Sequence, residues 1–304
     1  MTCNSLKVLA IFSIVTQISA LHAQGRTAVS LAYQLTHSAN YDPSPSPDGT
    51  RFVYISPVAG REQLFTMNVD GTRRMQLTHE DIDHEDPAWS PDGKKIAFVY
   101  IKADTEAVAL MNVDGTGVEI LTPKGTRAIH PNWSPDGTRV AYCTDDDLAP
   151  PRKNDSDIQV VDLRTRRITT LITGGVNTYP AWSPDGRQLA FRRMLGEMNS
   201  EVFIANGDGS GARNLTNHPA FDGWPSWSPD GTQIAFASNR NSSYQIFVMK
   251  PDGSDVRLMA NTEGRATGPQ WGRDGKHIYF PICKNVDFGG DCEIFAVRTD
   301  GFTR

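Results

Sequence analysis

The fold is decided by the stretch Pro87-Ala88-Trp89-Ser90-Pro91-Asp92-Gly93-Lys94-Lys95-Ile96-Ala97-Phe98. Its centre has the chemistry of a tight turn, because proline presets φ at the second position, Asp tolerates the third, and Gly accepts a positive φ at the fourth. The flanking residues include the aromatic and β-branched types that favour strands. The stretch therefore predicts two short antiparallel strands joined by a hairpin turn.

The same Ser-Pro-Asp-Gly turn recurs along the chain. It occupies residues 46–49, 90–93, 134–137, 183–186 and 228–231, and a degenerate copy, Gly-Arg-Asp-Gly, occupies 272–275. Successive copies begin 44, 44, 49, 45 and 44 residues apart. Five copies follow a tryptophan: Trp89, Trp133, Trp182, Trp227 and Trp271, whereas the first follows Pro45. A fixed period of this length is typical of a repeat architecture.

Each repeat contains four strand candidates. The first ends at the tryptophan, the second is an apolar triplet such as Ile96-Ala97-Phe98, and the third is exemplified by residues 245–249. The fourth carries a Leu-Thr pair, as in Leu77-Thr78, and follows a second Asp-Gly turn in every copy except the third, which has residues 163–167 there. Six four-stranded units predict an all-β fold, a six-bladed β-propeller with antiparallel strands.

The two ends of the chain complement each other. The last copy ends at Thr299-Asp300-Gly301 without room for a fourth strand, and Tyr33-Gln34-Leu35-Thr36 precedes the first copy. We therefore expect the N-terminal strand to complete the last blade and to close the ring, which leaves no open edge between the first and last blades. The competing fold, a linear β-solenoid, needs capping repeats instead.

Composition and the N-terminus indicate the compartment. Residues 1–23 have the layout of a secretory signal peptide, with Lys7 before an apolar stretch and a possible cleavage site before Gln24. Residues 24–304 are then a single propeller, periplasmic or secreted, and we expect a monomer. The apolar stretch is too short to span a bilayer, and nothing else predicts a membrane span. A net charge of −5 offers no counter-charge for nucleic acid.

Export makes the cysteines interpretable. Cys283 ends the second strand of the sixth repeat and Cys292 begins the third. Antiparallel neighbours bring such residues to disulfide distance, and an oxidising compartment preserves the bond. The alternative is two buried free thiols. Cys143 is then unpaired and structural.

Topology separates the two faces of the disc. The tight turns gather on one face, and the variable loops 79–86, 143–157, 192–200, 217–224 and 281–292 gather on the other. The residues before each inner-strand proline should ring the channel mouth on the variable face. The predicted partner-binding residues there are Tyr41, Asp42, Glu85, Asp86, His130, Tyr179 and Trp224. Trp224 alone among the tryptophans lies outside the repeat position, which suits a recognition anchor, although Trp224 and Phe221 could instead simply cover the channel end.

Metal and enzyme chemistry receive little support from the sequence. His84, His130, Asp42 and Asp86 are candidates to converge on a divalent metal, but Asp and His before proline also satisfy backbone groups in turns. No cofactor is therefore assigned. The acidic loop Asp145-Asp146-Asp147 lacks the glycine spacing of a calcium motif. No nucleophile elbow, zinc-protease or phosphate-loop motif is present, whereas acidic pairs assembled from different blades stay possible.

The opening stretch, with Met111-Asn112-Val113-Asp114-Gly115-Thr116 and Leu121-Thr122 after it, resembles the TolB-type (WD40-like) propeller repeat. The resemblance covers about residues 30–304. TolB is a periplasmic protein of the Tol–Pal envelope system, which binds a peptidoglycan-associated lipoprotein through its propeller and has an additional N-terminal α/β domain that this chain lacks. Similar propellers precede the hydrolase domain of prolyl-oligopeptidase-family enzymes, and some oligogalacturonate lyases share the repeat and bind a metal in the channel.

Three functions follow as hypotheses. The first is an exported, non-catalytic binding or scaffold protein that engages a protein or peptide in the cell envelope through the variable face and the channel mouth. The second is a carbohydrate-active lyase or hydrolase with its site in the central channel. The third is a purely structural module. Fold resemblance alone does not choose between them.

Overall fold

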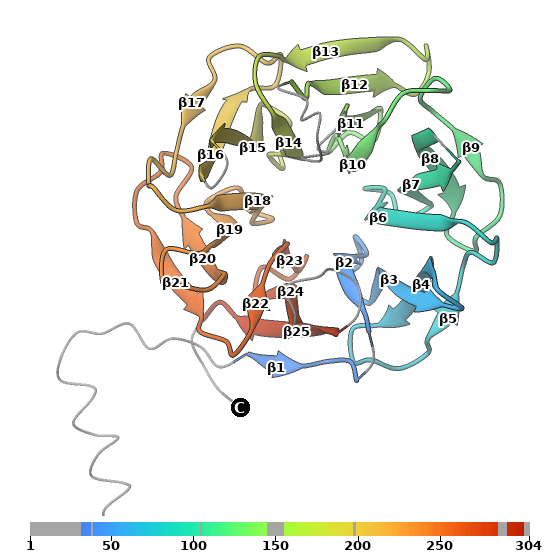
Figure 1. The fold of residues 1–304 in the computed structure, drawn as a ribbon, viewed down its shortest axis with the longest axis horizontal. Coiled ribbons are helices and arrows are strands. Elements are labelled where there is room, and N and C mark those ends of the chain that lie inside the picture. Colours follow the sequence, from blue (N-terminus) through green and yellow to red (C-terminus); the bar gives the residue numbers. More distant parts are fainter. Residues whose placement is uncertain are drawn as a thin grey trace, which may run out of the picture.

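The computed structural model describes residues 32–37, 39–103, 105–144, 155–196, 199–284 and 291–300. These residues form six antiparallel sheets arranged around a central channel (Figure 1), so the predicted six-bladed β-propeller is confirmed. The described residues contain no helix. Each blade runs from an inner strand at the channel to an outer strand at the rim.

The first three blades follow one plan. Blade one comprises β2 (Tyr41–Pro45), β3 (Arg51–Val58), β4 (Arg61–Asn68) and β5 (Met75–Gln76). Blade two comprises β6 (Asp83–Trp89), β7 (Lys95–Lys102), β8 (Thr105–Asn112) and β9 (Glu119–Ile120). Blade three comprises β10 (Ile129–Trp133), β11 (Arg139–Cys143), β12 (Ile158–Asp162) and β13 (Ile168–Ile172).

Blades four and five follow the same plan, and blade six differs from it in its inner and outer strands. Blade four comprises β14 (Asn177–Trp182), β15 (Gln188–Gly196), β16 (Asn199–Asn206) and β17 (Arg213–Asn214). Blade five comprises β18 (Asp222–Trp227), β19 (Ile234–Ser238), β20 (Gln245–Met249) and β21 (Arg257–Ala260). Blade six has a divided inner strand, β22 (Arg265–Ala266) and β23 (Gln270–Trp271), then β24 (His277–Cys283), β25 (Cys292–Arg298) and the N-terminal β1 (Tyr33–Gln34).

The core lies between neighbouring blades, and the repeated tryptophan is part of it. Trp89 packs with Val53 and Leu64 of the preceding blade, and all three are buried. The Trp133 indole N–H donates to the Ala88 carbonyl at 3.0 Å, and the Trp227 indole makes the same bond to Ala181 at 3.1 Å. The indole N–H groups of Trp89, Trp182 and Trp271 make no such bond, so what the five tryptophans share is packing against the preceding blade.

The ring closes as the sequence predicted. β1 pairs antiparallel with β25 and lies along the outer edge of the last blade (Figure 1). Next to it, the Ile294 amide donates to the Thr36 hydroxyl at 3.0 Å. The Leu64 amide makes the same bond to Thr78 at 2.9 Å inside blade one. The threonine of the N-terminal Leu-Thr pair thus bonds to the third strand of blade six, as the threonine of the internal pair bonds to the third strand of blade one.

The predicted disulfide is present in blade six. Cys283 and Cys292 face each other in the β24–β25 register and are bonded, with their Cα atoms 4.0 Å apart. Cys143 is buried and belongs to no disulfide. Residues 1–23 lie outside the described residues, so the signal peptide stays a prediction. Across the described part of the chain, no helix has the length and apolar character to cross a membrane.

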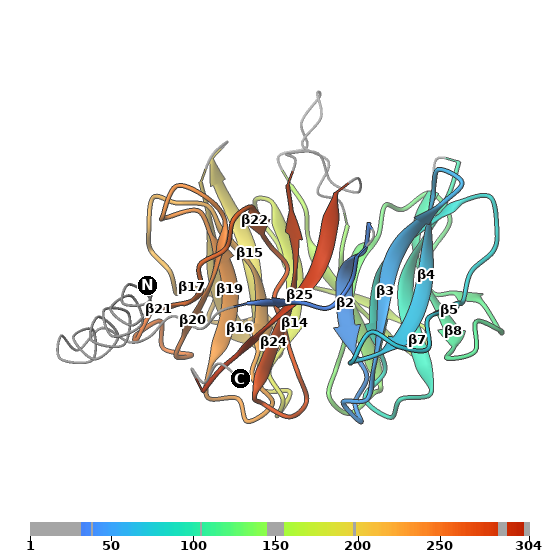
Figure 2. The same ribbon diagram turned by 90° about the horizontal axis from the view of Figure 1, so that it is seen from below.

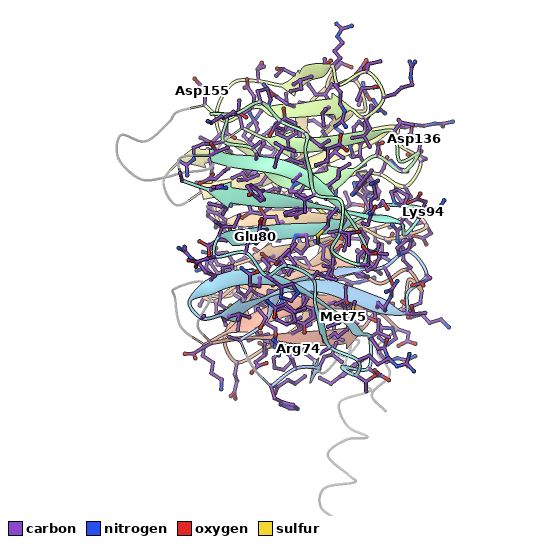
Figure 3. The ribbon with its side chains drawn as sticks, turned by 90° about the vertical axis from the view of Figure 1, so that its right-hand side faces the viewer. Arg74, Met75, Glu80, Lys94, Asp136 and Asp155 are labelled. Carbon is purple, nitrogen blue, oxygen red and sulfur yellow. A yellow bond between two sulfur atoms is a disulfide. The ribbon has the colours of Figure 1, made fainter. Side chains whose placement is uncertain are left out.

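The two faces of the disc differ, with the short turns on one face and the variable loops on the other. Figure 2 shows the disc edge-on, with its strands running from one face to the other. In Figure 3, Lys94 and Asp136 of two Ser-Pro-Asp-Gly turns mark one face, and Asp155 marks the opposite, variable face. The short turns hold their own carboxylates. Asp92, for example, accepts a hydrogen bond from the Ser90 hydroxyl at 2.7 Å and one from the Lys94 amide at 3.1 Å.

Candidate functional site

Every inner strand carries a β-bulge just before its proline. In blade two, for example, the pairing register shifts between Glu85 and Ala88. The extra residue of each bulge has a left-handed backbone, with φ between 48° and 55°; these residues are Asp42, Asp86, His130, Tyr179, Trp224 and, in blade six, Gly268. Only glycine adopts this region without strain, and bulky residues such as Tyr and Trp are rare there. The bulge re-aims the side chain away from the regular pleat.

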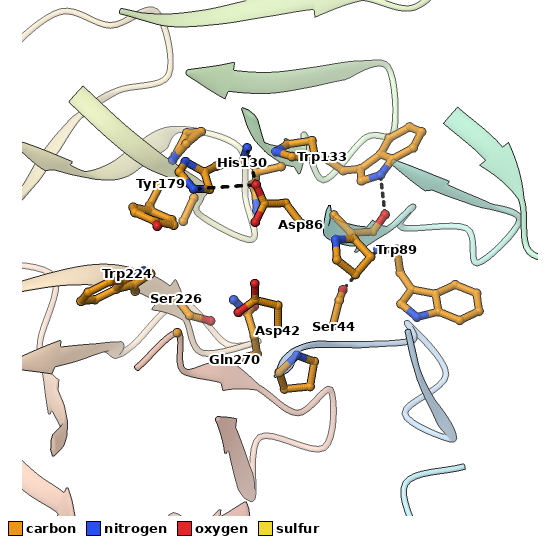
Figure 4. Close-up of a pocket in the computed structure, with 18 of the residues that line it drawn as sticks. Asp42, Ser44, Asp86, Trp89, His130, Trp133, Tyr179, Trp224, Ser226 and Gln270 are labelled. Carbon is orange, nitrogen blue, oxygen red and sulfur yellow. Dashed lines mark hydrogen bonds and ion pairs between the residues drawn. The ribbon is translucent and has the colours of Figure 1, made fainter. Parts of the chain in front are cut away.

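The bulges bring the predicted residues to one cavity. All seven, Tyr41, Asp42, Glu85, Asp86, His130, Tyr179 and Trp224, line a channel cavity of about 1130 Å³. Figure 4 shows five of them around the opening, with Asp42 and Asp86 directed toward it from neighbouring blades. The structure therefore assembles the predicted ring of side chains, while their binding role stays a prediction.

One side of the cavity is acidic. Burial raises the pKa of Asp42 to about 6, and the nearby Glu62 carboxylate adds to the effect. Burial raises the pKa of Glu85 to about 8, with further contributions from Asp86 and Asp42. Glu62 also has a raised pKa, caused first by burial, and it accepts a hydrogen bond from the Tyr41 hydroxyl. Burial and the neighbouring carboxylates thus raise the pKa of all three carboxyl groups above the usual range.

Glu62 was not among the residues that the sequence predicted. It lies in β4, outside the inner strand, and no motif marks it. The only available signal was its place beside the β3–β4 hairpin on the variable face. Its proximity to Asp42 comes from the tertiary structure, in which both residues line the channel cavity.

The opposite side of the cavity is aromatic. The Tyr179 ring lies 3.7 Å from the His130 ring and 5.5 Å from the Trp224 ring, measured between centroids. Phe221 and Tyr244 extend the cluster, at 5.7 Å and 5.8 Å from Trp224. Trp224 is only partly buried and lines the channel, so it both covers part of the channel wall and presents a surface to the cavity.

A buried arginine supports this aromatic side. The Arg192 guanidinium lies 4.7 Å from the Tyr179 centroid and 5.6 Å from the Trp224 centroid, and the residue is 4% exposed. Arg192 also donates from Nε to the Thr178 hydroxyl at 2.8 Å. Gly223 provides the space, because a Cβ there would lie 2.8 Å from Arg192 Cδ. Sequence reasoning missed Arg192, since it belongs to a second strand that the repeat makes apolar elsewhere.

His130 joins the two sides. Its backbone amide donates to Asp86 Oδ2 at 3.1 Å, and its Nε2 lies 3.7 Å from the same oxygen. Its Nδ1 lies 3.1 Å from the buried Cys143 sulfur. This network fixes the imidazole between the acidic and aromatic groups. The sequence placed Cys143 at a strand end without foreseeing this contact.

His84 does not line the channel cavity that the other metal candidates, His130, Asp42 and Asp86, share. His84 is 1% exposed, packs between the rings of Phe98 and Tyr100, and pairs with Glu80 at 3.4 Å. Its side chain is buried within the blade because His84 precedes the bulge that re-aims Asp86. Within the described ranges, no three His, Cys, Asp or Glu side chains are grouped to hold a metal ion. The acidic loop at 145–147 lies outside the described residues.

Comparison with known proteins identifies the repeat. The family model for the TolB beta propeller domain matches residues 15–151 and 105–299. A putative TolB from Agrobacterium tumefaciens has a TM-score of 0.67 at 21% identity, with 90% of this chain and 97% of that one covered. A gluconolactonase from Xanthomonas campestris has a TM-score of 0.68 at 14% identity, covering 89% of this chain and 91% of that one.

An oligogalacturonate lyase, solved in complex with manganese, has a TM-score of 0.61 at 14% identity, with 90% of this chain and 96% of that one covered. No curated protein matches the sequence. Similarity at these identities establishes the fold alone, and the same fold supports both binding proteins and enzymes.

Proposed function

Because this chain belongs to the TolB β-propeller domain family, we propose that it is a non-catalytic binding protein of the periplasm or the extracellular space. It engages a protein or peptide partner through the channel mouth on the variable face. The disulfide between Cys283 and Cys292 is consistent with an oxidising compartment.

The observation that carries the proposal is the ring of left-handed residues. Gly268 satisfies the bulge in blade six without strain, and the other five blades instead place Asp42, Asp86, His130, Tyr179 and Trp224 there. Residues held in such sparsely populated backbone regions cost on the order of 1 kcal/mol each and are concentrated at functional sites. A ring needed only for closure would be more stable with glycine at these positions. Their side chains therefore matter for what enters the channel.

The two sides of the mouth favour a basic side chain from the partner. Asp42, Glu62 and Glu85 offer carboxylates that lose their protons when a cation approaches, since an opposite charge lowers the pKa of a carboxyl group. Tyr179 and Trp224 offer ring faces, which also attract cations. A lysine or arginine side chain would meet both kinds of group at once.

Calorimetric titration with the peptide acetyl-Lys-Ala-Ala-Ala-Ala-amide tests this function. We expect binding, no binding of the peptide with norleucine in place of lysine, and about tenfold weaker binding by Trp224→Ala and Asp42→Asn. Asp255→Asn is the matched control, because Asp255 is an exposed carboxylate beside a tight turn of blade five. Equal affinity for the lysine and norleucine peptides would contradict the proposal.

Capture from the cell envelope then identifies the natural partner. The wild-type chain serves as bait, and a Trp224→Ala, Asp86→Ala double variant serves as the negative bait. A genuine partner is retained by the first and lost by the second while the melting temperature of the bait stays comparable.

A carbohydrate-active enzyme is the second candidate, and the paired carboxyl groups favour it. Glu85, with a pKa of about 8, keeps a proton at neutral pH, and Asp42, with a pKa of about 6, is mostly ionised. A protonated acid beside an ionised carboxylate is the arrangement that glycosidic bond cleavage requires. Turnover of uronide oligosaccharides that Glu85→Gln abolishes would establish this candidate in place of the first.

A further inference from the structure

The far end of the channel carries an irregularity that the mouth does not explain. Five blades place a proline at the second position of the Ser-Pro-Asp-Gly turn: Pro47, Pro91, Pro135, Pro184 and Pro229. These turns contact one another around the ring. A Cβ on Gly93 would lie 3.4 Å from Pro47 Cγ, and one on Gly231 would lie 3.7 Å from Pro184 Cδ. In blade six the position belongs to Arg273, whose Cβ would lie 3.8 Å from a Cβ on Gly49.

The ring of turns is open on one side of Arg273. Nothing lies within 4 Å of a Cβ placed on Gly275, in contrast to the glycines of the other turns at this end. A second cavity of about 270 Å³ occupies this gap, and Arg273 lines it together with Trp271 and the carboxylates of Asp230 and Asp274. Arg273 also lines the main channel cavity, so its side chain is reached from both.

The Arg273 guanidinium has no counter-charge in the described part of the chain. No ion pair or side-chain hydrogen bond involves it there, and burial alone accounts for its lowered pKa, with no carboxylate contributing. The nearest turn carboxylates are already engaged. Asp230 accepts from the Ser228 hydroxyl at 2.6 Å, and Asp274 accepts from the His277 ring at 2.6 Å. An arginine stays charged at neutral pH, and Arg273 is exposed, so it presents a hydrated cation to the channel with no ion pair among the described residues.

We propose that Arg273 is an anion-binding position that receives the carboxylate end of the peptide whose basic side chain occupies the mouth. This inference rests on the proposed function. The inner strand of blade one runs from Asp42 at the mouth to Pro47 at the turn, a rise of about 15 Å at the usual strand spacing. An extended peptide covers this length in about four or five residues. The channel therefore selects a basic residue about four positions before a free C-terminus.

The charge distribution sets the direction of the peptide. Carboxylates at the mouth repel a carboxyl terminus and attract a basic side chain, and Arg273 does the reverse at the other end. A guanidinium forks two hydrogen bonds onto one carboxylate, which fixes the terminus more firmly than a single contact. The two ends together discriminate against a peptide bound in the opposite sense.

The test compares peptides that differ only at the terminus. By calorimetry, acetyl-Lys-Ala-Ala-Ala-Ala with a free carboxylate should bind wild-type protein about tenfold more tightly than its amide. A third peptide, amidated but ending in glutamate, distinguishes a side-chain carboxylate from a terminal one. The gain from the free carboxylate should disappear in Arg273→Gln and in Arg273→Pro, and affinity for the amide should be unchanged in both.

Arg273→Pro keeps the experiment interpretable, because it gives blade six the turn residue of the other five blades. Arg187→Gln is the matched control, since Arg187 follows the blade-four turn on the same face and is 85% exposed. If the amide binds but the carboxylate adds nothing, or if its gain survives in both variants, the Arg273 inference is wrong and the proposed function stands. If neither peptide binds, both are wrong.

Discussion

Asp42 combines two unfavourable features in one side chain. Its backbone has φ of 48°, and its carboxyl group is desolvated beside Glu62 and Glu85. Neither feature helps the fold, because strain and like-charge repulsion both destabilise the folded state. At the scale of single residues, Asp42 at the mouth therefore lowers the stability of the folded state.

Replacing Asp42 by glycine should reverse part of that loss. Asp42→Gly copies the bulge of blade six at Gly268, whereas Asp42→Ala removes the charge and retains a side chain at positive φ. We expect the glycine variant to exceed the alanine variant in free energy of unfolding by about 1 kcal/mol. Urea unfolding of the two variants measures the difference, and a more stable alanine variant would disprove the role of backbone strain.

Glu85 should make stability depend on pH. Its pKa is about 8 in the folded chain and close to 4.5 when unfolded, so the folded state binds the extra proton between these values. The contribution of Glu85 is fully present below pH 4.5 and is lost as the pH rises through 8. Glu85→Gln removes this titration. The free energy of unfolding of Glu85→Gln minus that of wild type should therefore be larger at pH 8.5 than at pH 5, by at least about 1 kcal/mol, a figure that allows for water in the channel. Parallel pH profiles of the two proteins would refute this.

At the scale of elements, the ring depends on a strand pairing between residues far apart in sequence. Thr36 accepts a hydrogen bond from the Ile294 amide and donates to Glu293 at 2.8 Å. Thr78 is the matched internal case, because it accepts from Leu64 and donates to Gln63 at 2.8 Å. The two threonines make chemically alike hydrogen bonds, but only those of Thr36 hold the ends of the chain together.

Thr36→Val and Thr78→Val should therefore differ in where they loosen the fold. Each removes two hydrogen bonds and leaves a buried amide unpaired, at a cost of about 1–3 kcal/mol. Hydrogen exchange should show faster opening of β25 and β24 in Thr36→Val, and of blade one in Thr78→Val. Unchanged exchange in β25 of the Thr36 variant would mean that the N-terminal strand does not close the ring.

The disulfide across the β24–β25 hairpin is the second element-scale device. It joins residues nine apart in sequence. Because the disulfide restricts the unfolded chain, it contributes about 2–3 kcal/mol to the free energy of unfolding. Replacing Cys283 and Cys292 by serine together should lower the free energy of unfolding by that amount, and reductant should then have no further effect. A wild-type protein insensitive to reductant would show that the bond does not stabilise the fold.

At the scale of the whole molecule, the channel joins an acidic mouth to a far end where Arg273 lines the wall. Binding of the amidated lysine peptide should tighten between pH 5 and pH 9, because Asp42 and Glu85 lose their protons while lysine keeps its charge. Added salt should weaken it, since charged contacts in a wet channel are screened. Calorimetry at three pH values checks this, and tighter binding at low pH would exclude a cationic ligand.

Much of the fold and part of the site were predictable. The strand number and the seven mouth residues follow from positions within one repeat, because turn chemistry is local. Ring closure follows from the complementary ends of the chain, and the disulfide from two cysteines at the ends of neighbouring strands. The position of His84, apart from the residues that line the channel, has a local cause as well. The bulge re-aims Asp86 but leaves His84 inside the blade, and a shift of register cannot be deduced from spacing alone.

A closed propeller with tight turns on one face follows from the amino-acid order, since a motif repeated at a near-constant interval prescribes the same hairpins in every blade. The tertiary structure alone decided which distant groups meet. Glu62 joins the acidic side, Arg192 lies under the aromatic rings, and Arg273 faces the channel. Their charges and pKa values depend on burial and on neighbours from other strands and blades, and these distances exist only once the ring has closed.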